Sequence, residues 1–439
     1  MADASIPAGK APARARGPMG AAFAVPAYRW YWSSQLVSGI GTWAQAVAQS
    51  WLVLKLTGSA FALGAVATLQ FLPMLVFPLL GGVVADRIPR RRLLLATQIG
   101  ALAQAVLLGV LVWTGTVQYW EVAALALLLG LTNAFGNPAQ QALVPELVGR
   151  DMVGNAVALN SVQFNLARLL GGAIGGLAVA TLGIAATLFL NAASYLPAIV
   201  VLAVIRPAHA SSAARVGARV VGDIGDGLRY ALGTPSIRRV LALFAVVGLL
   251  GFNWTVAVPL LAVSLGAGPA GFGAMMSALG IGSLVAGLIL MRGHDATERV
   301  LALAGIGLGG ALVLLGLSSW YGVSLALLVV AGLVGITATV TANTRLQLLT
   351  PDAFRGRVMS LFVMLMGGTT PIGALVLGAI AQAWGIRVGL FVFGSLTIVS
   401  LLAIVALNRS MNAEPARAAS AVVDIEAVAS ASAGPAAGD

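Results

Sequence analysis

The chain has 439 residues, of which 59% are hydrophobic and only 9% are charged, with a net charge of +11. Soluble globular proteins carry about 25% charged residues, so this chain has too few polar groups to cover a surface in water, and a bilayer is its expected surrounding. The absence of cysteine excludes disulfides and thiolate metal sites, and the two histidines, His209 and His294, both fall in predicted loops, so no metal or cofactor is expected.

Apolar stretches of roughly the 20 residues that a spanning helix needs follow one another along the chain. Strands of a membrane barrel instead alternate apolar and polar residues in segments of about ten. We therefore predict an all-α polytopic membrane protein with twelve transmembrane helices. The predicted spans are 30–54, 61–85, 93–114, 120–142, 155–181, 184–205, 237–262, 270–291, 300–317, 323–346, 358–382 and 386–407.

The polar segments of the chain divide these spans into two groups of six. Residues 1–28 lack a short apolar core with a cleavage site, so they are predicted to form a disordered cytoplasmic arm and not a signal peptide. Residues 206–236 are predicted to be a cytoplasmic linker between two six-helix halves, at 29–205 and 237–408. Residues 409–439 are rich in Ala, Ser, Gly and Pro, and are predicted to be a disordered cytoplasmic tail.

The two halves share a pattern that indicates an internal repeat. Four residues of the first half recur in the second half at a constant offset of 206: Asn137, Gln141, Pro145 and Glu146 match Asn343, Gln347, Pro351 and Asp352. Repeated halves with a substrate site between them are a common plan of secondary transporters. Glycines at small-residue spacing, such as Gly171, Gly172, Gly175 and Gly176, are predicted to allow close helix packing.

Basic residues indicate the orientation of the spans. All but three of the 25 lysines and arginines fall on one side when alternate loops are assigned to it; Lys55 and Arg387 lie on the other side and Arg168 lies within a span. Because basic loops resist translocation, both termini are predicted in the cytoplasm of a multi-pass protein of the inner membrane. The net charge is explained by these anchors and their contact with membrane lipid, and no nucleic-acid partner is expected.

The loop after the second predicted span carries the most specific motif. It reads Gly82-Val83-Val84-Ala85-Asp86-Arg87-Ile88-Pro89-Arg90-Arg91-Arg92 and resembles the loop 2–3 signature of the major facilitator superfamily. Three further stretches resemble the branch that contains enterobactin exporters and macrolide efflux proteins: 51–60, 137–147 and 165–168. The resemblance covers roughly residues 28–408, and it implies the major facilitator fold and transport by alternating access.

The resemblance further implies a conformational latch in loop 2–3, made of Gly82, Asp86, Arg87, Arg90 and Arg91. A carboxylate at a helix end can pair with loop arginines or with the amide end of a partner helix, which gives such a latch a physical basis. The alternative is that the arginines are only topology anchors.

Polar residues within the spans are candidates for the substrate pathway. In the first span they fall on one helical face: Gln35, Ser38, Thr42, Gln45 and Gln49. Asn133 and Asn137 form a similar set in the fourth span. Such residues are costly in lipid, so they are predicted to line a cavity, and the alternative is that they hydrogen-bond to neighbouring helices.

Arg168 lies near the middle of the fifth span and shares a helical face with Asn165. A charge at that depth costs at least about 2.5 kcal/mol on insertion scales, so polar surroundings are expected. The functional interpretation is that Arg168 attracts an anionic substrate group or couples gating. The structural alternative is an arginine satisfied by helix carbonyls and side-chain amides.

No aspartate or glutamate occupies the middle of a predicted span, and Thr42 stands where related exporters often carry an aspartate. Many proton-driven carriers use such a carboxylate as a relay, so protons are a candidate coupling ion without an evident site. A carboxylate at a helix end, Asp86 or Glu121, is the remaining hypothesis.

The sequence therefore favours a monomeric secondary efflux transporter of a small amphipathic or anionic molecule, siderophore-like or drug-like. The alternatives are an uptake carrier of the same fold and a non-transporting membrane sensor or assembly protein. Enzymatic activity is not expected, and no glycine-rich phosphate loop of the GKS or GKT type is present to drive transport with ATP.

Overall fold

The computed structural model describes residues 20–76, 88–205, 228–291, 293 and 295–407, and these residues form helices and connecting turns with no strand among them. The first half contains α1 (Pro26–Thr57), α2 (Ala60–Val76), α4 (Arg90–Thr114), α5 (Tyr119–Val148), α6 (Val153–Thr181) and α7 (Ile184–Val204). Short 3₁₀ turns precede α1 at Ala21–Ala24 and α6 at Arg150–Met152. The prediction of an all-α membrane protein is confirmed.

The second half begins with an interrupted span. It is made of α9 (Pro235–Val246), a five-residue π-helix, η3 (Val247–Gly251), and α10 (Trp254–Ser264). It continues with α11 (Gly268–Met291), α12 (Glu298–Leu317), α13 (Tyr321–Leu349), α14 (Asp352–Trp384) and a last helix, Ile386–Leu407.

Ten of the twelve predicted spans correspond to described helices that are long and apolar enough to cross a bilayer. The other two correspond to α1 and α2. α1 has 32 residues, but its polar residues make it less apolar, and α2 is described over only 17 residues, up to the undescribed stretch 77–87. The count of twelve therefore depends on these two helices.

Most of the predicted arm, linker and tail lies outside the described residues. The described part of the arm, 20–28, is helical and packed: Tyr28 is fully buried, and the Ala22 amide donates to Asn155 Oδ1 over 3.0 Å. The predicted domain boundaries otherwise stay predictions.

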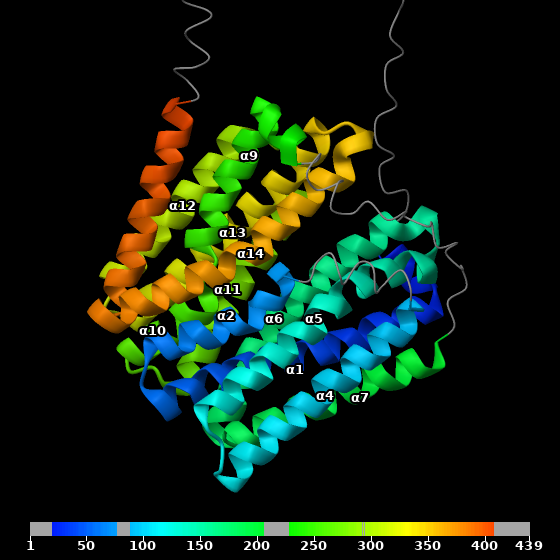
Figure 1. The fold of residues 1–439 in the computed structure, drawn as a ribbon, viewed down its shortest axis with the longest axis vertical. Helices are drawn as coiled ribbons and strands as arrows, with labels where there is room; N and C mark the ends of the chain where they lie inside the picture. The colour runs from blue at the N-terminus through cyan, green and yellow to red at the C-terminus, as the bar shows by residue number, and fades with distance from the viewer. Residues whose placement is uncertain (1–19, 77–87, 206–227, 292, 294, 408–439) are drawn as a thin grey trace, which may run out of the picture.

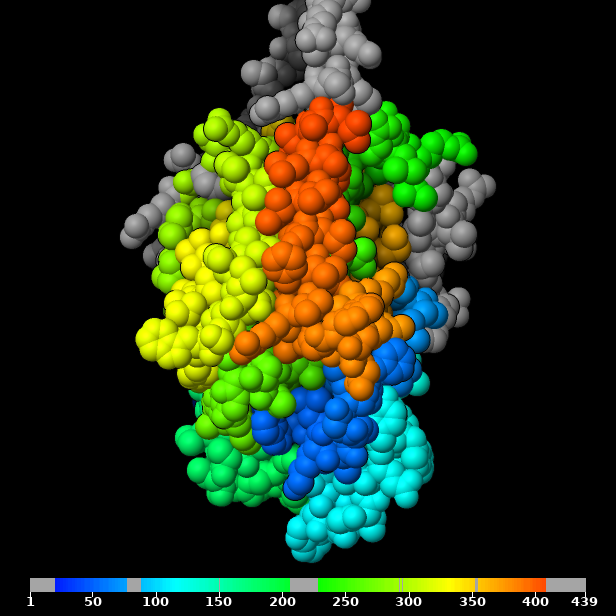
Figure 2. Space-filling model, turned by 90° about the vertical axis from the view of Figure 1, so that its left-hand side faces the viewer, coloured from blue at the N-terminus to red at the C-terminus, as the bar shows by residue number. Residues whose placement is uncertain are grey.

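The two halves are separate bundles that touch mainly along two helix pairs, with smaller contacts of α10 on α1 and α2. In the first half α1 packs on α6 and α7, and α4 packs on α5 and α7; in the second half α13 packs on α11 and α12. The halves meet where α6 packs on α11 and where α2 packs on α14. Figure 1 shows the two bundles side by side, and Figure 2 shows the second contact as blue α2 residues against orange α14 residues.

We call the end of the bundle at which α1 ends and α2 begins the Gly58 end, and the opposite end, at which α4 begins, the Arg90 end. The halves touch from mid-helix toward the Gly58 end and diverge toward the Arg90 end (Figure 1). The basic-residue pattern predicts that the Gly58 end faces outside, so this arrangement is the one expected of a carrier open to the cytoplasm.

Candidate substrate pathway between the halves

Small residues bring the backbones of α6 and α11 into direct contact. A Cβ added at Gly176 would lie 2.6 Å from Gly273 Cα, and one added at Gly280 would lie 2.9 Å from Leu169 Cα. Ser277 Oγ also donates to the Leu169 carbonyl over 2.8 Å. The seam between Leu169 and the Gly58 end is thus closed at backbone distance, which confirms the predicted packing role of the glycines.

Arg168 lies where this seam ends on the side of the Arg90 end, which we call the inner end of the seam. Its Nη2 donates to Ser283 Oγ of α11 in a short contact and to Asn165 Oδ1 over 3.3 Å. Ser283 is buried and donates in turn to the Leu279 carbonyl over 2.8 Å. The guanidinium therefore joins the two halves through a hydroxyl.

Arg168 retains an unused donor. Its Nε is buried without a hydrogen-bond partner, and no described ion pair includes its guanidinium. A buried donor left unsatisfied is costly, and an anionic acceptor is the strongest partner for a guanidinium. The structure brings Asn165 and Arg168 together, as predicted from their shared face, and their role in substrate binding stays a prediction.

Beyond Arg168 toward the Arg90 end, the surface of α6 becomes exposed. Asn165 is half-buried, and Nδ2 of this residue donates to the Ser161 carbonyl over 2.9 Å. Phe164 is 56% exposed, and its ring lies edge-on to Trp43 of α1 at 5.8 Å between centroids. The open part of α6 thus offers a hydrogen-bonding group next to an aromatic surface.

The polar stripe of α1 faces the interior of the first half and not the seam with Arg168. Four of its five members, Gln35, Ser38, Gln45 and Gln49, are at most 8% exposed. Gln45 Nε2 donates to Gln104 Oε1 of α4 over 2.9 Å, and its Oε1 accepts from Asn191 Nδ2 of α7 over 2.7 Å.

The other members of the stripe have similar partners. Gln35 Oε1 accepts from Gln98 Nε2 over 3.1 Å, Gln49 Nε2 donates to Gln70 Oε1 over 3.2 Å, and Thr42 shares a hydrogen bond of 3.1 Å with Tyr195. Ser38 supplies a carbonyl to Thr42. These contacts are the interhelical hydrogen bonds of the alternative interpretation, because the stripe faces α2, α4 and α7 inside one half. A pathway role for the stripe stays a prediction.

The candidate asparagines of α5 are not among the described contacts of Arg168: Asn133 is half-buried and Asn137 is exposed. In the repeated segment of α13, Gln347 Nε2 donates to Asn343 Oδ1 over 2.6 Å.

Of the predicted latch, Gly82, Asp86 and Arg87 lie outside the described residues. Arg90 Nη1 lies 2.6 Å from Glu146 Oε1 of α5 and 3.1 Å from the Ala142 carbonyl. Arg91 donates to the Leu202 and Ala203 carbonyls of α7. Both described arginines therefore tie α4 to its neighbours within the first half, and the function of a latch between the halves stays a prediction.

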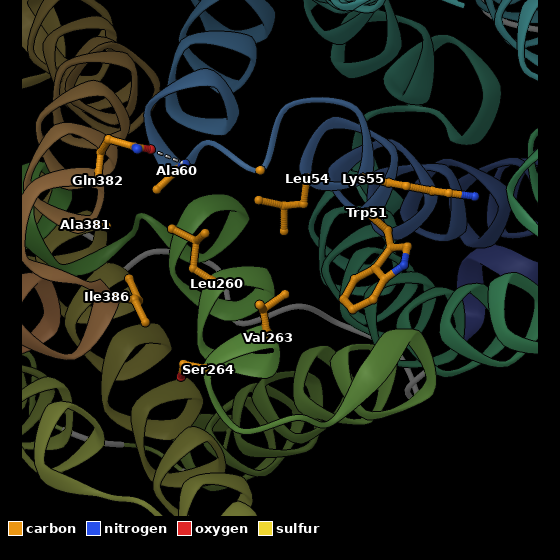
Figure 3. Close-up of a pocket in the computed structure, with 11 residues that line it drawn as sticks. Trp51, Leu54, Lys55, Ala60, Leu260, Val263, Ser264, Ala381, Gln382 and Ile386 are labelled. Atoms are coloured by element: carbon orange, nitrogen blue, oxygen red, sulfur yellow. Dashed lines mark hydrogen bonds between the residues drawn. The ribbon is translucent and has the colours of Figure 1, made fainter.

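A polar contact between the halves that the sequence analysis missed lies at the Gly58 end. Gln382 Oε1 of α14 accepts from the Ala60 amide over 2.8 Å and from Ser59 Oγ over 3.0 Å, so it caps α2 from the other half (Figure 3). Deeper in the same interface, Thr68 Oγ1 donates to the Pro371 carbonyl over 2.8 Å. No sequence signal predicts the cap, because its partners lie more than 300 positions apart.

Two helical bundles that touch at backbone distance on one end, diverge on the other and hold a half-buried arginine at the inner end of their seam define a two-half membrane carrier. The chain matches the family described as "Transmembrane secretion effector" over residues 18–433, and it belongs to this family.

Relatives that match most of the chain are named as transporters. The chain is 30% identical to the multidrug efflux pump Tap of Mycolicibacterium fortuitum, over 80% of this chain and 88% of that protein. It is 24% identical to the staphyloferrin A transporter of Staphylococcus aureus (87% and 96% covered) and 27% identical to the enterobactin exporter EntS of Escherichia coli (90% and 96% covered). The predicted resemblance to the siderophore-export and drug-efflux branch of the major facilitator superfamily is confirmed, and the protein is a transporter and not an enzyme.

Solved structures with the same fold include the nucleoside transporter NupG, with a TM-score of 0.68, 13% identity and coverage of 87% of this chain and 98% of that one. A bacterial homologue of the iron transporter ferroportin in an inward-facing state gives a TM-score of 0.66 at 15% identity, with 87% and 98% covered. At these identities the likeness concerns the fold alone.

Proposed function

We propose that this protein exports a small amphipathic anion by alternating access and that Arg168 binds the anionic group of the substrate. Export is supported by the relatives, which are named as efflux pumps and siderophore exporters. The anionic character is supported by the structure around Arg168, described next.

The observation that carries the proposal is the incomplete set of partners around Arg168. Its described polar contacts are the neutral side chains Asn165 and Ser283, and its Nε has no described partner. A half-buried cation without a described counterion favours an incoming anion, which gains charge-assisted hydrogen bonds there. A cationic substrate would meet repulsion at the same point.

The same contact links binding to movement. The Arg168–Ser283 hydrogen bond crosses from one half to the other, so an anion that takes over the guanidinium competes with a bond that holds the halves in their present arrangement. A ligand shifts a conformational equilibrium only through such a difference in affinity between states. Substrate binding at Arg168 therefore loosens the seam from its inner end.

The remaining features of the transport cycle are part of the proposal. The state with a closed Gly58 end is the loading state, and both termini lie in the cytoplasm with the Arg90 end. The carrier works as a monomer in the inner membrane and exchanges protons for substrate. Glu121 is the N3 residue of the capping box of α5, where its Oε2 accepts from the amide of the N-cap Gln118 over 2.8 Å, so Asp86 is the favoured proton-binding carboxylate.

The test is export of a compound panel from pump-deficient cells, with siderophores, macrolides, dyes and organic acids, for the wild type and variants at equal expression. Arg168→Gln should abolish export of the anionic class, and Arg168→Lys should retain part of it because the charge remains. Arg387→Gln serves as the control, since Arg387 lies at the Gly58 end away from the seam contact. Undiminished export of an anion by Arg168→Gln refutes the role of Arg168, and a panel without any exported compound argues against export itself.

A further inference from the structure

A cavity of about 510 Å³ lies between the two halves at the Gly58 end (Figure 3). The first half contributes Trp51 and Leu54 of α1, and the second half contributes Leu260 and Val263 of α10 and Ile386 of the last helix. This volume is within the range of small-molecule sites, about 300–1,000 Å³. Because its walls belong to both halves, the cavity keeps its shape only while the halves are together at this end.

The polar groups of the lining offer donors and one positive charge. Lys55 is exposed at the rim, with its ammonium group directed away from the apolar walls (Figure 3). Gln382 uses its Oε1 to cap α2, and its Nε2 makes no hydrogen bond with a described residue. Ser264 donates its hydroxyl to the Leu261 carbonyl over 2.8 Å. None of the described residues that line the cavity is acidic, so an acceptor with negative charge is the complementary head group.

We propose that this cavity binds an alkyl chain with one anionic head group, and that its occupant holds the Gly58 end closed. The chain lies against Trp51, Leu260 and Val263, and the head group lies at the rim, where the exposed Lys55 side chain turns toward it on binding. Such a ligand contacts both halves, so it binds the closed state and not a state in which the walls have separated. The binding does not depend on the export proposed above; only its consequence for transport does.

The binding test uses the full chain in nanodiscs of phosphatidylcholine, with 12-bromododecanoate as a probe that quenches nearby tryptophans. Saturable quenching is expected in the wild type and should be largely lost in Trp51→Phe. Lys55→Gln should raise the Kd about two- to fivefold, the range of an exposed ion pair. Arg387→Gln, the other basic residue predicted on this side, should leave the Kd unchanged.

Two control measurements distinguish binding in the cavity from misfolding of the Trp51→Phe variant and from partitioning of the probe into lipid. Val263→Phe fills the cavity from the other half and should weaken binding without altering Trp51, and 12-bromododecanol should bind the wild type as weakly as the carboxylate binds Lys55→Gln. Equal saturable quenching in the wild type and Trp51→Phe, or quenching that only rises linearly with probe, overturns the proposal.

Two additional experiments identify the source of the ligand and its effect on closure of the Gly58 end. If phosphatidylglycerol discs abolish probe binding, an anionic lipid is the occupant; if they do not, a free amphiphile is. Spin labels on cysteines at Leu182 and Trp320, both exposed at the Gly58 end of different halves, report closure. Bound probe should enrich the short distance, and an unchanged or longer distance at saturation refutes the effect on the gate.

Discussion

Gly273 is the position at which a single methyl group should disfavour closure of the Gly58 end. A Cβ there would lie 2.5 Å from the Gly172 carbonyl oxygen and 2.7 Å from Gly176 Cα, both backbone atoms of the opposite half. Ordinary contact begins at 3.4 Å, so α6 and α11 must separate by about 1 Å in a Gly273→Ala variant. Overpacking of this kind costs about 1–3 kcal/mol.

That cost falls on the closed state alone, because the seam is absent once the halves have separated at this end. A bias of about 1–3 kcal/mol corresponds to a shift of about 5- to 150-fold in the population ratio. We therefore expect Gly273→Ala to move the equilibrium toward the state open at the Gly58 end and to lower the rate of export.

The assay is the distance distribution between spin labels at Leu182 and Trp320, and the absence of native cysteine makes the labelling specific. Gly310→Ala is the matched control: it adds the same methyl group within α12, where a Cβ meets nothing within 4 Å. The gain in helix propensity is common to both variants, so it cancels in the comparison. A wild-type distance distribution in folded Gly273→Ala would refute a seam closed at backbone distance.

Three further outcomes are expected. Gln382→Glu should favour the closed Gly58 end, because an anionic cap stabilises a helix N-terminus. Gln382→Met should favour the open end by about two- to fivefold, because loss of an exposed cap costs about 0.5–1 kcal/mol. The spin labels at Leu182 and Trp320 test both variants, and shifts of both in the same direction would contradict the capping role. Gln45→Leu should lower the free energy of unfolding by about 1–3 kcal/mol, because the buried amides of Gln104 and Asn191 lose their partner. Thermal unfolding measures this loss, and an altered substrate range at unchanged stability would instead support a pathway role for Gln45. A double-mutant cycle on Arg90 and Glu146, whose side chains are 22% and 15% exposed, should give a coupling energy of about 1 kcal/mol or less in stability assays. If these variants also changed the distance between the spin labels at the Gly58 end, the pair would act as a latch between the halves.

The membrane spans of this chain could be predicted from hydropathy, but the ends of several helices could not. The length of an apolar stretch reports the part of a helix that lipid surrounds, so the spans were predicted while several helix ends were not. α5 continues to Val148, beyond the predicted end at 142, and α14 begins at Asp352, before the predicted start at 358. These extra turns carry Glu146, Arg355 and Arg357 at the Arg90 end, where hydropathy is low although the backbone stays helical.

The candidate site was predictable only in part, because periodicity identifies a helical face and not its neighbour. Asn165 and Arg168 are three positions apart, and their contact follows from helix geometry. The stripe from Gln35 to Gln49 also lies on one face, but the interior of the first half was a possible destination as well as the pathway. Its partners Gln98, Gln104 and Asn191 are amide side chains within apolar spans, and their presence there is the available signal.

The distribution of hydrogen bonds explains how two rigid bundles can move against each other. Within the first half, Gln45 joins α1 to both α4 and α7, and Arg90 joins α4 to α5. Between the halves, the described side-chain hydrogen bonds are few and lie on different levels of the seam: Gln382 at the Gly58 end, Thr68 deeper in α2, Ser277 at the Leu169 carbonyl, and Arg168 at the inner end. Because lipid supplies no hydrophobic force between helices, these contacts and the glycine seam account for most of the specific cohesion between the halves. A substrate that takes Arg168 away from Ser283, as proposed above, would remove one of these contacts without disturbing either bundle.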